Sequence, residues 1–216
     1  MKIALIISLK DTAALNIKKH LIKDFILTEE IFRENNVYKL NEDVKLYTTP
    51  LDSVHSENID DEINADLFIF CTRHRSESGI PSLSIHSPGN FAVAKYGGTD
   101  RELNSCPASF LKKGLRLLEE NKMDGFDIIQ ECTHHGPYMR KPVMFIEIGS
   151  TEKEWERDDA GSVIAKVIIE LVSSSVTECE SADLIIRLTL KKYSLSQILL
   201  SDTSAQSTTW RILIER

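Results

Sequence analysis

The chain has 216 residues, 42% of them hydrophobic, and a formal net charge of −7. This length can bury the core of one domain, and the acidic balance argues against a protein that coats nucleic acid through a broad basic surface. No apolar run reaches the roughly 20 residues of a membrane-spanning helix, and the four cysteines are scattered without a Cys-x-x-Cys pair. We therefore expect a single-domain, monomeric protein of the reducing cytoplasm with no membrane segment.

The first third of the chain alternates strand-like and helix-like patterns. Residues 2–8 form a continuous apolar run, typical of a buried strand. Residues 11–23 place apolar side chains at helical spacing after Asp11, a good N-cap residue. Residues 44–48 alternate apolar and polar types, which predicts a half-exposed strand, and 65–71 predict a second buried strand.

The middle of the chain holds a long irregular stretch, 72–106, in which residues 82–85 could form a short strand. Such a long loop in a compact domain is usually functional or disordered. Beyond it, a helix is predicted over 107–121, with proline at its first position. Strands are predicted over 126–131 and 143–149.

Thr151 and Glu154 then form a capping-box pattern, and we expect it to open a helix with a continuous apolar stripe from Ala160 to Leu171. Strands that alternate with helices indicate an α/β fold with a mainly parallel central sheet and helices on both faces. Ligands of such sheets bind outside the carboxyl ends of the strands.

Four of the six histidines lie in three polar segments that each follow an apolar run: His74, His86, and the pair His134 and His135. We expect these three strand-exit loops to form one composite site. Gly136 follows the pair and begins a Gly-Pro turn that would let both imidazoles face one metal, or let one act as a base. The alternative is a loop with two ordinary surface histidines.

His74 lies between Arg73 and Arg75. Two guanidinium groups favour a neutral imidazole, as a metal ligand must be, and they would also bind phosphate. Glu77 could pair with one of them. A charged, solvated loop is the alternative, and it applies equally to His86.

Glu131 and Glu147 stand at or near the ends of apolar strands, where a carboxylate is costly to bury unless it is paired or binds metal. Glu147 is the better candidate, and an outward-facing position is its alternative. Gly97 and Gly98 could let the backbone approach a phosphate or a ribose, although a lone Gly-Gly pair lacks the context of a dinucleotide fingerprint.

Taken in order, five segments of this sequence resemble the archaeal and plant type of D-aminoacyl-tRNA deacylase. They are Thr72–Leu83, His86–Asn90, Gly97–Leu103, Thr133–Pro137 and Glu147–Gly161. The resemblance covers residues 1 to about 172.

The resemblance implies a zinc-dependent enzyme that hydrolyses the ester between tRNA and a D-amino acid or misloaded glycine, as translation quality control. It also implies a fold similar to the peptidyl-tRNA hydrolase and nucleoside phosphorylase group. We expect His86, His134 and His135 to bind the metal or transfer protons, with Glu147 as base or ligand. The residues expected to bind the substrate are Arg73, His74, Arg75, Glu77, Ser78, Asn90, Gly97, Gly98 and Arg101.

Residues 173–216 depart from the family pattern and contain no histidine, glycine or proline. A shifted reading frame or a truncation is one hypothesis for this atypical tail. Two alternatives to the hydrolase therefore remain: an inactive relative that binds tRNA ends or a partner, and a nucleoside- or phosphate-ester enzyme on the same scaffold.

Overall fold

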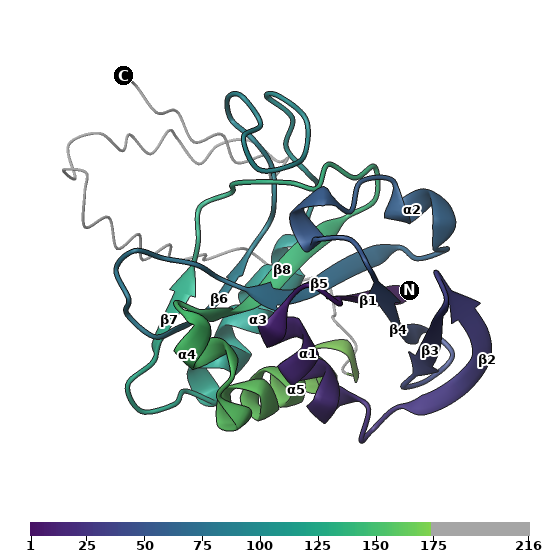
Figure 1. Ribbon diagram of the computed structural model, residues 1–216, viewed down its shortest axis with the longest axis horizontal. Helices are drawn as coiled ribbons and strands as arrows, with labels where there is room; N and C mark the ends of the chain where they lie inside the picture. Colours follow the sequence, from purple (N-terminus) through teal and green to yellow (C-terminus); the bar gives the residue numbers. More distant parts are fainter. Residues whose placement is uncertain (174–216) are drawn as a thin grey trace, which may run out of the picture. The chain divides into compact units, whose positions relative to one another are not determined.

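The structure, a computed structural model, describes residues 1–173 and contains an eight-stranded sheet in the order β2-β3-β4-β1-β5-β8-β6-β7 (Figure 1). The strands are β1 (Ile3–Ser8), β2 (Ile26–Phe32), β3 (Asn35–Lys39), β4 (Val44–Thr49), β5 (Leu67–Arg73), β6 (Ser82–His86), β7 (Asp127–Gln130) and β8 (Val143–Gly149). The helices are α1 (Thr12–Leu21), α2 (Ile59–Glu62), α3 (Ala108–Glu120), α4 (Glu152–Trp155) and α5 (Asp158–Ser173), with a 3-10 turn, η1 (Ser53–His55).

The centre of the sheet consists of β4, β1, β5 and β8, which run parallel to one another. Every residue of β1 and of β8 is buried, as is all of β5 except its last residue. The predicted α/β class and the predicted buried strands are therefore confirmed. Continuous apolar runs identify such strands because both of their faces are covered.

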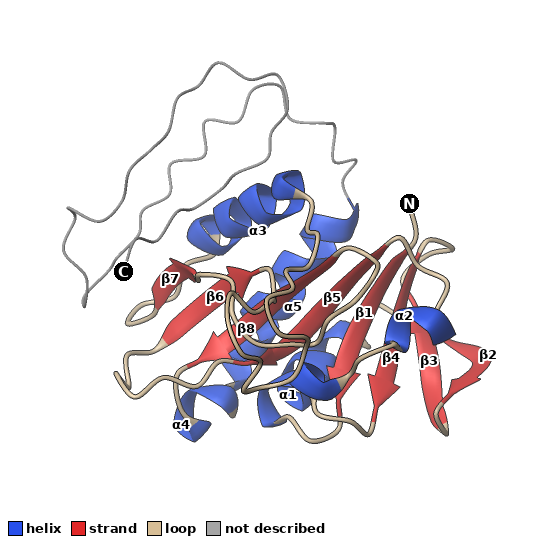
Figure 2. Cartoon of the chain, turned by 90° about the horizontal axis from the view of Figure 1, so that it is seen from above, coloured by secondary structure: helices blue, strands red, loops and turns tan. Residues whose placement is uncertain are grey.

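Helices cover the two faces of the sheet unequally (Figure 2). The core beneath one face includes side chains of α1, α3 and α5, such as Ile17, Phe110 and Ile164. The opposite face carries a smaller core in which Ile59 of α2 packs with Phe68 and other strand residues. Long loops cover the rest of this second face, and His134 and His135 lie in one of them.

The short strands β6 and β7 reverse the direction of the sheet: β6 runs antiparallel to β8, and β7 runs parallel to β6. The carboxyl ends of β6 and β7 therefore point to the opposite end of the sheet from the carboxyl ends of β5 and β8. The three histidine segments therefore do not leave from one end of the sheet, as they would if all of its strands were parallel. A site made from these loops must be assembled over the face of the sheet, around β8.

Three local predictions need correction. Strand β4 is more buried than the alternating pattern predicts, because only Lys45 is partly exposed. Pro107 is the N-cap of α3 rather than its first helical residue. The capping box of Thr151 and Glu154 is present, but it opens only the four-residue α4, and the apolar stripe belongs to the separate helix α5.

The antiparallel hairpin of β2 and β3 was not predicted from the sequence. No helix among the described residues is long and apolar enough to cross a membrane. Cys71, Cys106 and Cys132 are free thiols. The predicted atypical tail lies outside the described residues apart from its first residue, Ser173.

Candidate metal centre

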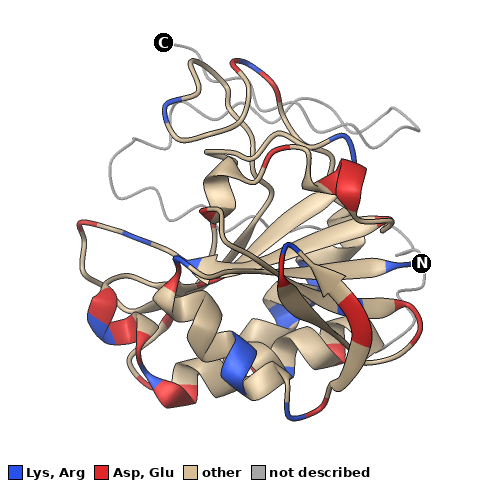
Figure 3. Cartoon of the chain, turned by 45° about the vertical axis from the view of Figure 1, so that its right-hand side comes forward, with Lys and Arg blue, Asp and Glu red and all other residues tan. Residues whose placement is uncertain are grey.

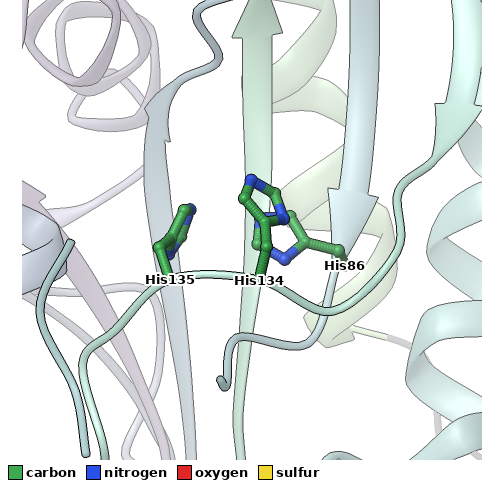
Figure 4. Close-up of side chains that lie close together, drawn as sticks. All are labelled: His86, His134 and His135. Carbon is green, nitrogen blue, oxygen red and sulfur yellow. The ribbon is translucent and has the colours of Figure 1, made fainter. Parts of the chain in front are cut away.

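Three histidines converge beside β8: His86 from the end of β6, and His134 and His135 from the loop after β7 (Figure 4). The ring centroids of His86 and His134 are 4.5 Å apart, those of His86 and His135 are 5.0 Å apart, and those of His134 and His135 are 4.3 Å apart. One ligand nitrogen of each ring lies within 4.8 Å of one from each of the others. The structure therefore brings together the three residues that the sequence selects as metal ligands.

Each of these imidazoles is oriented by the backbone. The Nδ1 atoms of His86, His134 and His135 lie 3.2, 2.9 and 2.6 Å from carbonyl oxygens of Ser87, Cys132 and Gly136, respectively. A carbonyl accepts only from a protonated Nδ1, so Nε2 is the nitrogen that each ring would offer to a metal. Metal-binding histidines commonly have this arrangement. Burial lowers the pKa of His86, but Glu147 outweighs this effect and raises the pKa, so a metal at this position would displace the Nε2 proton of His86.

Two further observations favour a cation at this position. Nε2 of His86 is buried and has no hydrogen-bond partner among the described residues. Burial, followed by the neighbouring charges of His86 and His134, lowers the pKa of His135 to about 3. Burial and His86 also lower the pKa of His134. The rings of His134 and His135 are thus neutral at physiological pH, as metal ligation requires.

Glu147 is a fully buried carboxylate in the middle of β8, next to this cluster. Its Oε1 accepts a hydrogen bond from the Thr72 hydroxyl at 2.7 Å, and its Oε2 lies 3.6 Å from Nε2 of His86. Burial raises the pKa of Glu147, but the imidazoles of His74 and His86 outweigh this effect and hold the pKa well below its usual range. The carboxylate is therefore charged, and the outward-facing alternative for Glu147 is excluded.

His74 belongs to a second group, with Glu131 and Glu147, in which one ligand atom per residue also lies within 4.8 Å of the others. Its Nδ1 is 3.0 Å from Oε2 of Glu131 and 3.6 Å from Oε2 of Glu147. Burial lowers the pKa of His74, but hydrogen bonds to the two carboxylates outweigh it and raise the pKa to about 10. The prediction that the flanking arginines keep His74 neutral is therefore wrong, because the nearby carboxylates favour its charged form.

Arg73 and Arg75 point to the side of the sheet that the helices cover. The Arg73 guanidinium donates to the carbonyl of Lys10 at 2.8 Å, and Arg75 pairs with Glu152. Both guanidinium groups lie over the ring of Trp155, which belongs to the helix-side core. The strand alternation that brings His74 to the cluster turns its two neighbours away from it.

The expected pairing of Glu77 with one of these arginines is not what the structure shows, because Arg73 and Arg75 are paired with Asp52 and Glu152. Glu77 and Ser78 are exposed in the loop between β5 and β6, and Arg101 is exposed in the loop between β6 and α3. The cluster of histidines does not include these residues, and their role in substrate binding stays a prediction.

Asn90, Gly97 and Gly98 position the histidine loop. The Asn90 side chain donates to the carbonyl of Gly97 at 3.0 Å, and the Gly98 amide donates to Oε1 of Glu57 at 2.8 Å. A Cβ atom on Gly97 would lie 1.7 Å from the carbonyl oxygen of Val54. The glycines therefore allow close packing within the protein, rather than the open phosphate cradle that the Gly-Gly pair suggests.

Glu131 and Ser84 also belong to the site, beside Glu147, although the sequence points only weakly to Glu131 and not at all to Ser84. Ser84 donates to Glu147 at 3.4 Å from the neighbouring strand. A signal was available, because serines at 82 and 84 alternate with apolar residues in a strand that is buried throughout. Polar residues on a buried strand face need partners, and here Glu147 is one.

The sequence and the fold both match known proteins. The family model described as D-aminoacyl-tRNA deacylase matches residues 61–188. D-aminoacyl-tRNA deacylases of Pyrococcus furiosus and Thermococcus kodakarensis are 37% and 35% identical over 74% and 76% of this chain. The chain spans 62% and 63% of the length of these two relatives.

Solved structures agree with the fold. The crystal structure of a conserved protein of unknown function, AF0625, is 29% identical and has a TM-score of 0.75, with 80% of this chain and 64% of that chain covered. Futalosine hydrolase of Helicobacter pylori, at 10% identity and a TM-score of 0.51, shares the fold alone over 80% of this chain and 98% of that chain. The family model covers more than half of the sequence, and the chain belongs to the D-aminoacyl-tRNA deacylase family.

Proposed function

We propose that this protein hydrolyses the ester bond of D-aminoacyl-tRNA, and of mischarged glycyl-tRNA, releasing tRNA and the free amino acid in the cytoplasm. Family membership supports the reaction class, and relatives of this sequence carry the name of that activity. The observation that carries the proposal is the convergence of three Nδ1-anchored histidines beside a buried, charged glutamate.

His86, His134 and His135 would hold a zinc ion through Nε2. Three imidazole ligands leave a fourth coordination position open, as in catalytic rather than structural zinc sites. The buried Nε2 of His86, which lacks a partner among the described residues, fits such a ligand. Bound zinc would supply a water of lowered pKa and would polarise the ester carbonyl.

The protein groups around this position have separate tasks. Glu147 is a charged carboxylate held by Thr72 and Ser84, so it can accept a proton from a water near the histidines. Glu131 and His74 form an ion pair at 3.0 Å that closes the other side of Glu147. The His74 imidazolium, shared between Glu131 and Glu147, stabilises the charged form of Glu147.

The deciding experiment measures zinc content and deacylation together on the full 216-residue chain. We expect bound zinc, release of D-amino acid from D-aminoacyl-tRNA, and loss of that release on addition of a chelator. His134→Ala and His135→Ala should each lose zinc and activity. Mutation of the surface residue His55 to Ala is the matched control and should change neither. Full hydrolysis by both site variants would contradict the proposal.

The same measurements address the two alternatives. A chain that binds tRNA but shows no zinc and no turnover would be the inactive relative. Hydrolysis of free nucleosides or phosphate esters, with no action on D-aminoacyl-tRNA, would indicate the other alternative, a nucleoside- or phosphate-ester enzyme. The similarity to futalosine hydrolase, at 10% sequence identity, concerns the fold alone and does not favour a nucleoside- or phosphate-ester enzyme.

A further inference from the structure

The segment 89–103, between β6 and α3, exposes several large apolar side chains. Tyr96 is 71% exposed, Val93 63% and Phe91 52%, and Leu103 is also exposed. All four lie between residues 91 and 103, and the Arg101 amide, which donates to the carbonyl of Ala92 at 2.9 Å, joins the two ends of the segment. Exposed apolar groups gathered in this way mark interaction sites.

This segment is fastened to the histidine loop by backbone hydrogen bonds. The Gly136 amide donates to the carbonyl of Tyr96 at 2.9 Å, and the Gly89 amide donates to the carbonyl of His135 at 2.7 Å. These bonds join Tyr96 to the residue that directly follows His135. The backbone of this segment therefore lies directly against the histidine loop.

The segment is also held in one conformation from within. The Asn90 amide group donates to the carbonyl of Gly97, the Ala94 amide donates to Oδ1 of Asp100 at 2.7 Å, and the Arg101 amide donates to the carbonyl of Ala92 at 2.9 Å. A loop with this many internal bonds loses little conformational freedom when it binds a ligand. Preorganisation of this kind favours affinity.

We propose that segment 89–103 is a stacking surface for the unpaired nucleobases at the 3′ end of tRNA, with Phe91 and Tyr96 as its aromatic contacts. The proposal rests on the proposed function, which requires the 3′-terminal nucleoside to lie beside the histidines. Single-stranded nucleic acids bind proteins through stacking of bases on aromatic rings, and stacking tolerates any base.

The charge of the segment agrees with stacking as the source of affinity. Lys95 and Arg101 are balanced by Asp100 and Glu102, and positive and negative residues are interspersed along the ribbon (Figure 3). A site that relied on phosphate contacts would need an excess of positive charge. The nucleobases, rather than the backbone, are therefore the part of the tRNA end that this segment would recognise.

The test measures binding of a 5′-fluorescein-labelled RNA tetranucleotide, ACCA, to the full chain by fluorescence anisotropy. This readout needs no ester and no turnover, so it is independent of the proposed hydrolysis. Phe91→Ala and Tyr96→Ala should each weaken binding about tenfold. Tyr96→Phe, which keeps the ring, should bind as the wild type does. Ile31→Ala on β2 is the matched control, because Ile31 is 61% exposed but lies in the edge strand at the other end of the sheet.

Several results would overturn the inference. Unchanged affinity of Phe91→Ala and Tyr96→Ala would do so, as would the absence of tetranucleotide binding by the wild type. If light scattering showed a dimer that Tyr96→Ala dissociates, the segment would be an interface between copies of the chain. Failure of the proposed function has a different signature: the tetranucleotide would bind in a ring-dependent manner while D-aminoacyl-tRNA stays intact.

Discussion

At the scale of single residues, Glu147 decides what the site can do. Burying a carboxylate is unfavourable unless hydrogen bonds and opposite charges compensate for it. Thr72, Ser84 and two imidazoles provide that compensation here. The sheet therefore keeps a charged carboxylate next to the three histidines, where it can take up a proton.

Glu147→Gln tests this role, because glutamine keeps the size of the side chain and removes its basicity. We expect kcat for D-aminoacyl-tRNA to fall by about 100-fold or more, the usual contribution of a general base. Bound zinc, measured by atomic absorption, should stay at the wild-type level. Glu152→Gln, at an exposed glutamate paired with Arg75, should leave both quantities unchanged. A variant that loses zinc would show instead that Glu147 is a ligand.

At the scale of elements, two loops hold each other in place above β8. A Cβ atom on Gly136 would lie 2.2 Å from the amide nitrogen of Gly98 and 2.4 Å from the carbonyl carbon of Gly97. Gly136 does not have a positive φ, so its backbone conformation would accept another residue. The close contact with Gly97 and Gly98 is what requires glycine at this position. The spacing between the loops thus sets the position of His135.

Gly136→Ala should therefore weaken zinc binding by about tenfold or more, a typical effect of disturbing the groups that orient metal ligands. A competition titration with a zinc indicator measures this change. Gly125→Ala separates the effect from general destabilisation: Gly125 has a φ of +79° and no neighbour within 4 Å of the added Cβ. That variant should lose about 1 kcal/mol of stability with the zinc affinity unaltered. Equal zinc affinity of both variants would refute the spacing argument.

Asp11 links two elements at once. Its Oδ1 accepts from the Ala14 amide as the N-cap of α1, and its Oδ2 accepts from the Arg73 amide at the end of β5, each at 2.9 Å. Asp11→Ala should lower the free energy of unfolding in urea by about 2 kcal/mol. Asp66→Ala, which removes an exposed carboxylate from a single amide contact, should cost less. A smaller loss for Asp11→Ala than for Asp66→Ala would be the contrary result.

The sequence predicts the central elements because their burial leaves a direct pattern of apolar runs. The β2–β3 hairpin escapes prediction because β2 is mostly exposed, and because its turn uses Arg33 and Glu34 at φ of 48° and 64° instead of the usual Asn-Gly. The reversed direction of β6 was also missed. The connection 74–81 is shorter than the dozen residues that a parallel crossover needs, and this was a usable signal.

The site residues also differ in how well the sequence predicts their positions. His86, His134 and His135 are recognisable because they stand at or shortly after the ends of strand-like runs. Arg73 and Arg75 are adjacent in sequence to a cluster residue yet lie on the other side of the sheet, because side chains alternate along an extended chain. Proximity along the sequence is therefore a poor guide to proximity at this site.

At the scale of the whole molecule, the candidate metal centre joins parts of the chain that are far apart in sequence. His86 comes from the end of β6 and His135 from the loop before β8. An ion bound by both would restrain separate parts of the second sheet face. Ligands that bind only the folded state raise its stability by mass action.

Zinc should therefore raise the thermal midpoint of the wild-type chain, by an amount equivalent to about 2.7 kcal/mol when free zinc is 100 times its dissociation constant. Differential scanning fluorimetry with and without a chelator measures this shift. His135→Ala should show little or none of it, while Ile31→Ala should retain it in full. A shift of the same size in His135→Ala would place the stabilising ion elsewhere.

The anchoring of all three rings to main-chain carbonyls has a consequence for the order of assembly. His134 and His135 are neighbours in the sequence and follow β7, but His86 stands at the end of β6, so the third ring joins them only when β6 and β7 have paired. In an unfolded chain, only His134 and His135 would be close enough to bind the same cation, and two ligands bind it weakly. Tight capture would then be a late event, and a metal-sensitive optical signal during refolding should lag behind secondary-structure formation, reporting when the sheet is complete.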